Sequence, residues 1–335
     1  MSDAISLAEV EAAQPIVYQH MRPTPLIHYP LLSQEMGFQA YVKHENHTPI
    51  GAFKIRGGLN LMAHLARQGV PGVITATRGN HGQSVALAAR FYHIPATIVV
   101  PVGNNPEKNA LMRAQGAELI EHGRDFDEAR ALVEELQHER GLRYVHPANE
   151  PLLVNGVGTY WLEVYHDLPD LDVAFVPVGG GSGVCAAITV LKALRPAARI
   201  VGVQAENAPA VYNSWTSGQM CESESATTFA DGLATRVAFE MPFRIMQEGL
   251  DAMVLVSEDD MRQAIVRLLR TTHNLAEGAG AASVAAAWKL RESLAGQKVV
   301  MVLSGGNIDL ETLRWVLSEG GANATSRCPS DCTAL

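Results

Sequence analysis

The chain has 335 residues, of which 47% are hydrophobic and 6% aromatic, and that length suits one large α/β unit of two lobes. Its formal net charge of -9 argues against nucleic acid as the main partner. No cationic segment with a following apolar stretch opens the chain, and no apolar run approaches the roughly 20 residues that span a membrane. The four cysteines lack the spacing of a metal site or a disulfide framework, so we expect a cytoplasmic protein.

Short apolar runs alternate with helical patterns along the chain. This order predicts a mostly parallel sheet with helices on both faces. Buried strands are predicted at 73–75, 96–100, 173–178, 200–203 and 299–303. Two helices are predicted from apolar residues at helical spacing, namely Phe126, Ala129, Val133 and Leu136 in one and Met261, Ile265, Leu268 and Leu269 in the other.

Lys54 lies between Phe53 and Ile55, just before a predicted helix, in the segment Gly-Ala-Phe-Lys-Ile-Arg-Gly-Gly at 51–58. A lysine amine becomes nucleophilic only when desolvation or a neighbouring cation lowers its pKa. The segment alone is equally consistent with a lysine at a helix start whose stem covers apolar surface.

A glycine-rich turn follows the predicted strand at 173–178 and precedes a predicted helix at 185–193. Its glycines allow successive backbone N–H groups to point at one anion, beside the positive end of the helix dipole. The turn lacks the Gly-Lys-Ser/Thr of a nucleotide P-loop and the spacing of the dinucleotide fingerprint. We therefore expect a single phosphate to bind Gly179, Gly180, Gly181, Ser182 and Gly183.

Ser304 directly follows the predicted strand at 299–303. Ligands of open α/β sheets bind at such strand ends, although a serine there can also be a cap beside turn glycines. A lysine amine, a phosphate cradle and a strand-end hydroxyl together describe a site for pyridoxal 5'-phosphate. In that site Lys54 carries the cofactor, the glycine turn holds its phosphate, and Ser304 meets its pyridine nitrogen.

These segments resemble the fold-type II pyridoxal-phosphate enzymes, specifically the serine/threonine dehydratase group. That group includes threonine ammonia-lyases, serine racemases and hydroxyaspartate dehydratases. Besides 51–58 and 179–183, the matching segments are 43–46, 79–83, 230–233, 277–280 and 304–307, in family order.

The resemblance implies an α/β fold like that of the tryptophan synthase β subunit, with two open, mostly parallel twisted sheets. It implies a large cofactor-binding domain at 1–69 and 150–320 and a small domain at 70–149. It also implies a homo-oligomer, a dimer or a tetramer. We expect 321–335 to be a flexible tail.

The resemblance further implies α,β-elimination of a β-hydroxy-α-amino acid to a 2-oxo acid and ammonia. Lys54 is then the catalytic base beside Cα. The implied cofactor-binding residues are Phe53, Lys54, Asn80, the glycine turn, Glu277 and Ser304. The implied substrate-binding residues are Thr77, Arg78, Gly79, Asn80 and His81. From the residues alone, His81 is also consistent with a helix-start histidine bonded to backbone.

Three positions depart from the family pattern. Arg78 stands where racemases carry a serine, so we expect no racemisation; it could hold a substrate carboxylate or point to solvent. Gln204 and Ala210 stand where racemases carry metal-binding carboxylates, so we expect no metal site. Ser182 replaces a glycine of the turn, and its hydroxyl could still reach phosphate.

Several functions stay open at this point. Threonine, serine, 3-hydroxyaspartate and aryl-serines all fit as substrates. A fold-type II β-replacement enzyme is an alternative that the contexts of Lys54 and Ser304 disfavour. A catalytically silent ligand-binding relative is a third, disfavoured by the joint presence of Lys54, the glycine turn and Ser304.

Overall fold

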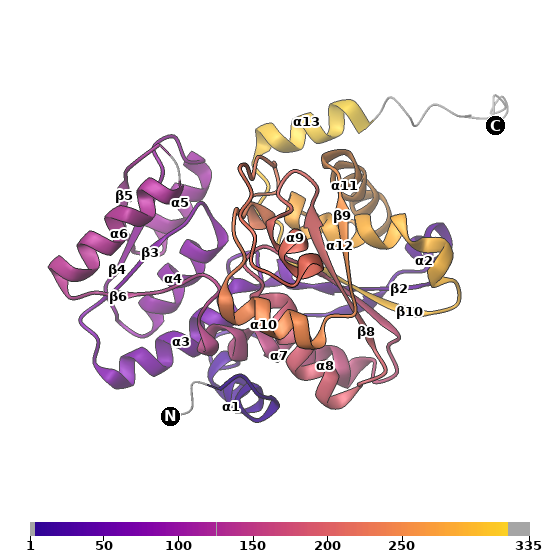
Figure 1. Cartoon of the computed structure of the whole chain (residues 1–335), viewed down its shortest axis with the longest axis horizontal. Helices are drawn as coiled ribbons and strands as arrows, with labels where there is room; N and C mark the ends of the chain where they lie inside the picture. Colours follow the sequence, from indigo (N-terminus) through magenta and orange to yellow (C-terminus); the bar gives the residue numbers. More distant parts are fainter. Residues whose placement is uncertain (1–3, 125, 321–335) are drawn as a thin grey trace, which may run out of the picture.

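The computed structural model describes residues 4–124 and 126–320, and they form two open sheets (Figure 1). Neighbouring strands are parallel except for the antiparallel pair β1 and β2, so the predicted α/β fold class is confirmed. The larger sheet has the order β1 (Leu26–His28), β2 (Gln39–His44), β10 (Lys298–Leu303), β7 (Val173–Pro177), β8 (Arg199–Ala205) and β9 (Ala252–Val256). The smaller has the order β5 (Glu118–Glu121), β4 (Ala96–Val100), β3 (Val73–Ala76) and β6 (Arg143–Tyr144).

Helices cover both faces of the larger sheet, as its continuous apolar strands require. Alternate residues of β10 show this, because Val299 and Met301 join one apolar cluster and Val300 and Val302 join the other. The first face is covered by α2 (Pro30–Met36), α11 (Glu258–Thr272), α12 (Gly278–Lys289) and α13 (Leu310–Gly320). The second is covered by α1 (Leu7–Val17), α7 (Pro151–Asp167), α8 (Ser182–Leu194), α9 (Ala210–Ser217) and α10 (Glu240–Gly249).

The smaller sheet is likewise buried on both faces (Figure 1). Its helices are α3 (Lys54–Gln68), α4 (Asn80–Phe91), α5 (Pro106–Ala114) and α6 (Phe126–Arg140). The described residues also form the short 3-10 turns η1 (Glu45–His47), η2 (Asp231–Leu233) and η3 (Arg291–Leu294). All strands of this sheet lie between residues 73 and 144. The domain boundaries stay a prediction, and the expected flexible tail at 321–335 lies outside the described residues.

The predicted strands are all present, and none of their bounds differs by more than two residues. Both amphipathic helices are present too, although Leu269 is only half-buried. The prediction for the helix after the glycine turn was wrong at its start, since α8 begins at Ser182 rather than at 185. Gly181 explains this early start, because its backbone has φ +101° and turns the chain sharply before Ser182. Among the described residues, no helix combines the length and apolarity needed to cross a membrane.

Candidate active site

The start of α3 and the end of β10 meet although Lys54 and Leu303 are 249 residues apart in the chain. The Phe53 N–H donates to the Ser304 carbonyl at 3.0 Å, and Ala52 and Gly305 form an isolated antiparallel bridge. Lys54 is the first residue of α3, so this contact places its side chain beside the strand end that carries Ser304. The sequence-predicted lysine and serine therefore belong to one site.

The Lys54 amine lies in an enclosed environment with neutral partners. Its Nζ donates to the Pro147 carbonyl at 3.1 Å and to the Ser182 hydroxyl at 3.3 Å. It also lies 5.2 Å from the centre of the Phe53 ring. Desolvation by burial lowers the pKa of Lys54 to about 8. The amine is therefore readily available as a free base, which is the form that attacks a carbonyl or accepts a proton.

The glycine turn forms a cradle that side chains cannot enter. A Cβ at Gly179 would lie 2.1 Å from the Gly232 carbonyl oxygen, and one at Gly180 would lie 2.6 Å from Ala148 Cβ. The first helical hydrogen bond of α8 runs from the Cys185 N–H to the Gly181 carbonyl, so the preceding N–H groups have no partner within the helix. Such N–H groups at a helix N-terminus bind phosphate well, and the Ser182 contact brings Lys54 to the same place. The residues present therefore fit pyridoxal phosphate.

Asn80 is held from both ends of its amide. Its Nδ2 donates to Glu277 at 2.6 Å, and its Oδ1 accepts from Asn307 Nδ2 at 2.8 Å. Glu277 is buried, and desolvation raises its pKa although the Lys108 charge and the Asn80 amide oppose the rise. The Glu277 N–H also donates to the Gly305 carbonyl at 3.1 Å. Asn80 and Glu277 thus join α4 of the smaller sheet to the strand end of the larger sheet.

Ser304 is buried and directly follows β10. Its Oγ lies 3.4 Å from the Ala279 carbonyl oxygen in α12, which makes this a long hydrogen bond. The hydroxyl is thus only weakly engaged within the protein. A neutral hydroxyl at this position is the partner that the sequence predicted for a pyridine nitrogen.

The predicted substrate loop joins β3 to α4. Thr77 Oγ1 accepts from the Gly79 N–H at 3.1 Å, which orders the turn. His81 is buried and its Nε2 donates to the Val145 carbonyl at 3.2 Å; burial and the Lys54 charge lower its pKa to about 3. His81 is thus a neutral, backbone-bonded histidine, and its contact with substrate stays a prediction. Arg78 is exposed, and no ion pair or hydrogen bond joins it to another described residue.

An ion pair crosses from the smaller sheet to the larger one beside this loop. Lys108 of α5 pairs with Asp231 of η2, with Nζ and Oδ2 2.5 Å apart. The Lys108 side chain also lies against Gly79, where a Cβ would be 3.2 Å from Lys108 Cδ. Lys108, Asp231, Glu277 and Asn307 line a cavity of about 190 Å³. This places the space between the sheets next to the residues predicted to bind substrate.

Sequence reasoning missed several groups at this site. The Pro147 carbonyl left no signal, because it acts through backbone. Asp231 and Asn307 lie in segments that matched the family but received no role. Lys108 was not singled out at all.

A buried charge cluster lies behind Lys54. Arg56 Nε pairs with Glu45 at 2.7 Å and Arg56 Nη1 pairs with Glu163 at 2.6 Å, while Lys43 also pairs with Glu163. Thr24 and Thr159 add hydrogen bonds to the Arg56 guanidinium. In this cluster the carboxylates of Glu45 and Glu163 balance the positive charges of Lys43 and Arg56, so the cluster carries no net charge.

Gln204 and Ala210, the positions where no metal site is expected, make other contacts within the protein. The buried Gln204 accepts the Tyr212 N–H through Oε1 at 2.8 Å, whereas Ala210 is buried in α9. Glu206 is exposed. Within residues 4–124 and 126–320, no three His, Cys, Asp or Glu side chains gather as metal ligands do.

Comparison with known proteins agrees with this geometry. Residues 17–305 match the family model described as pyridoxal-phosphate dependent enzyme. An L-threonine ammonia-lyase of Geobacter sulfurreducens is 40% identical, over 93% of this chain and 78% of that protein. A catabolic L-threonine dehydratase of Staphylococcus aureus is 36% identical, over 94% of this chain and 93% of that protein.

Solved structures of the same kind superpose closely. The processed form of threonine deaminase isoform 2 from Solanum lycopersicum has a TM-score of 0.89 and 34% identity, over 94% of this chain and 92% of that one. Maize serine racemase has a TM-score of 0.89 and 28% identity, over 94% of this chain and 98% of that one. With its lysine, glycine cradle and strand-end serine in one site, the chain belongs to the pyridoxal-phosphate dependent enzyme family.

Proposed function

We propose that this protein is a pyridoxal-phosphate dependent ammonia-lyase that converts threonine, or serine, to a 2-oxo acid and ammonia by α,β-elimination. One observation carries the proposal. Lys54 Nζ donates to the Ser182 hydroxyl of the glycine cradle, and the residue before Lys54 is bonded to the backbone of the neutral Ser304. The threonine ammonia-lyase and threonine dehydratases among its relatives support the same reaction class.

Each group then has a defined task. When bound, pyridoxal phosphate stabilises the negative charge that develops at Cα as its proton leaves. Lys54 removes that proton, since its lowered pKa makes the free base the main form at mildly alkaline pH and raises its fraction at neutral pH. The N–H groups of the cradle and Ser182 bind the phosphate, and Asn80 is oriented by Glu277 and Asn307 to face the cofactor.

The charges near the substrate loop favour a neutral side chain on the substrate. Lys108, the buried cation beside Gly79, is already paired with Asp231. Arg78 is exposed, so beside the substrate loop the described residues offer a second substrate carboxylate no enclosed cation that is not already paired or assigned to the cofactor. Threonine and serine therefore fit better than 3-hydroxyaspartate. The same exposed arginine is a poor proton donor, so we propose that elimination proceeds without racemisation.

We further propose that the protein acts in the cytoplasm as a homodimer or homotetramer. Its domains would be 1–69 with 150–320, and 70–149. The reaction would need no divalent cation, since Gln204 already uses its amide oxygen within the protein. Sedimentation of the holoenzyme and activity measured in a chelator would test the assembly and the metal independence.

An assay of the holoenzyme on L-threonine, L-serine, 3-hydroxyaspartate and phenylserine tests the proposal. We expect L-threonine to give 2-oxobutanoate and ammonia in equal amounts, faster than 3-hydroxyaspartate gives its products. Turnover that depends on an added thiol would favour β-replacement instead. Tight cofactor binding without turnover of any of the four would favour the silent ligand-binding relative.

A further inference from the structure

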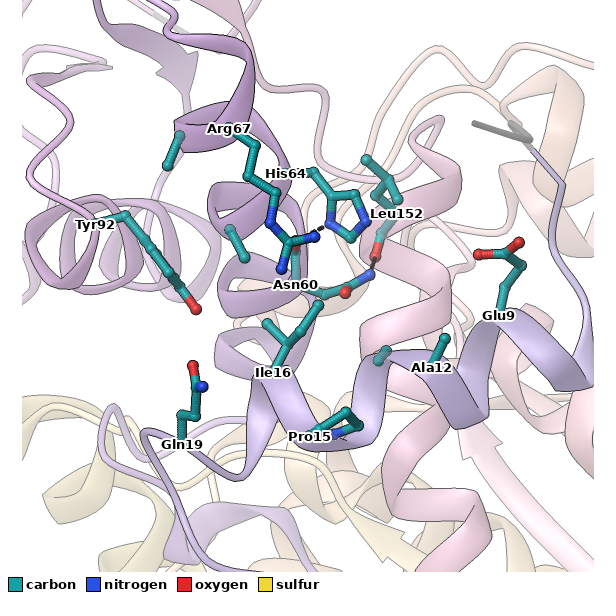
Figure 2. A pocket seen from close by; sticks show the side chains of 13 residues that line it. Glu9, Ala12, Pro15, Ile16, Gln19, Asn60, His64, Arg67, Tyr92 and Leu152 are labelled. Atoms are coloured by element: carbon teal, nitrogen blue, oxygen red, sulfur yellow. Dashed lines mark hydrogen bonds between the residues drawn. The ribbon is translucent and has the colours of Figure 1, made fainter.

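A cavity of about 590 Å³ lies between α1, α3 and the carboxyl end of α4 (Figure 2). None of its lining residues belongs to the cofactor or substrate site described above. It is therefore a second cavity of the molecule, open to solvent on one side, where the Arg67 side chain is exposed.

One face of α3 supplies much of the polar lining. Asn60, His64 and Arg67 recur at the three- to four-residue spacing that brings side chains to one side of a helix. Figure 2 shows them across from Pro15 and Ile16 of α1. The cavity thus has a polar wall on α3 and an apolar wall on α1.

Two buried polar atoms of the lining have no hydrogen-bond partner among residues 4–124 and 126–320. The Asn60 Nδ2 donates to the Leu152 carbonyl at 2.8 Å, but within these residues no donor reaches Asn60 Oδ1 and no partner reaches the Tyr92 hydroxyl. Asn60 is only 2% exposed. Buried groups of this kind are rarely left unsatisfied, because each costs stability until a partner arrives. One acceptor and one hydroxyl donor in the same cavity indicate a ligand that carries both complementary groups.

The charges of the lining narrow the class of ligand. Burial raises the pKa of Tyr92, and the neighbouring Arg67 guanidinium opposes that rise, which places a positive charge near the unpaired hydroxyl. Among the described residues, no carboxylate forms an ion pair with Arg67. Glu9 lies at the end of the cavity away from Tyr92 (Figure 2). One arginine suits a single carboxylate, and one cation does not balance the several negative charges of a nucleotide.

We propose that this cavity binds a small α-amino acid in its zwitterionic form. The ligand's carboxylate pairs with Arg67 and accepts from the Tyr92 hydroxyl. Asn60 Oδ1 is buried, so the Asn60 side chain turns toward the cavity when the ligand binds, and the ligand's ammonium donates to this oxygen. Its aliphatic part packs against Ile16 and Ala63, which line the same space.

The position of the cavity connects it to the reacting lysine. Asn60 and Arg67 belong to the helix whose first residue is Lys54, and Ser84 of α4 donates to the Lys54 carbonyl at 2.7 Å. A ligand that joins α1, α3 and α4 therefore holds the elements that position Lys54. The claim of binding stands apart from the proposed reaction, because no lining residue takes part in it.

Calorimetric titration with L-2-aminobutyrate tests the site, since this probe has no β-leaving group. The holoenzyme is first reduced with borohydride, so that Lys54 can no longer exchange its cofactor for the probe. We expect saturable binding that Tyr92→Phe and Arg67→Ala each weaken about 10-fold or more. The matched controls Tyr165→Phe and Arg244→Ala, away from the cavity, should leave it unchanged.

Two partial probes complete the test. Butanoate lacks the ammonium and propan-1-amine lacks the carboxylate, so each should bind at least about 10-fold more weakly than the amino acid. The proposal is overturned if L-2-aminobutyrate shows no saturable binding. It is equally overturned if Tyr92→Phe and Arg67→Ala bind it as the unaltered chain does. Neither result would bear on elimination, which the unreduced enzyme reports separately.

Discussion

Lys54 and Arg56 lie in the same first turn of α3, yet the protein treats their positive charges in opposite ways. The Arg56 guanidinium contacts two carboxylates and two hydroxyls, all buried. The Lys54 amine contacts one carbonyl and one hydroxyl. Burial lowers the pKa of both groups, but the Glu45 and Glu163 charges reverse this for Arg56 and raise its pKa overall.

The difference shows that burial alone does not make a cation reactive. Arg56 has anionic partners within hydrogen-bond distance, so its proton is held more tightly than in water. The hydrogen-bond partners of Lys54 among the described residues are neutral, so no anion there offsets the effect of burial and the pKa falls to about 8. The number of carboxylates within reach separates the structural cation from the catalytic one.

The largest effect is expected from Lys54→Ala. It should lower kcat/KM by at least about 10³-fold, because both the cofactor attachment and the base are lost. Borohydride reduction followed by peptide mass spectrometry should label Lys54 in the unaltered chain and no lysine in the variant. The exposed Lys289→Ala serves as the control. A label on the buried Lys43 would show that Lys43, and not Lys54, is the catalytic lysine.

Next in size is the effect of Arg56→Met on stability. The change leaves Glu45 without its cation in a buried place, so the free energy of unfolding should fall by about 3–5 kcal/mol. Urea unfolding measures this, and the exposed Arg113→Met should cost less than about 1 kcal/mol.

Arg56→Met combined with Glu45→Gln should recover part of the loss, because the unpaired carboxylate is then removed. A loss of activity in Arg56→Met without any loss of stability would contradict the structural role of Arg56.

A smaller effect is expected for Ser304→Asp. A carboxylate beside the pyridine nitrogen would keep that nitrogen protonated and favour a long-lived carbanion over elimination. Turnover should therefore drop by about 10–100-fold with the cofactor still bound. Ser304→Thr, which keeps a neutral hydroxyl, is the control. Full turnover in a cofactor-saturated Ser304→Asp variant would show that Ser304 does not set the electronics.

The smallest effect is expected in the pH dependence of cofactor attachment to Lys54. Only the free amine of Lys54 can attach the cofactor, and its fraction grows as pH rises through the pKa of about 8. The attachment rate of apoprotein, followed by absorbance between pH 6 and pH 10, should rise with a midpoint at about 8 and level off at higher pH. An ordinary lysine would have its midpoint at about 10.4. A midpoint there would mean that the Lys54 amine is not desolvated.

Much of the site could be predicted because each part is marked by its own neighbours in sequence. The glycine turn lies between a strand and a helix, Ser304 follows a strand, and Lys54 precedes a helix. The contacts that separate Lys54 from Arg56 could not be predicted in the same way. Glu163 is 107 residues from Arg56, and only the packing of α7 on α3 joins them.

Other parts escaped prediction because their signal is not in a side chain. The Pro147 carbonyl that accepts from Lys54 is backbone, which any residue could supply. The early start of α8 depends on the left-handed backbone of Gly181, which a glycine permits but does not require. The role of Asn307 became visible only when its amide was found on Asn80.

The Lys108–Asp231 pair has a consequence for the speed of substrate exchange. It bridges α5 on the smaller sheet and η2 on the larger one, so any widening of the gap between them separates two opposite charges. The Asp231 side chain is 38% exposed, which leaves the pair open to screening by salt. Higher ionic strength should therefore make that separation easier and speed the entry of substrate and the release of product. Within the part of the chain that the structure describes, Lys54 has no charged partner, so proton removal by Lys54 should be far less sensitive to salt. Ionic strength therefore offers a way to tell a gating step from a chemical one.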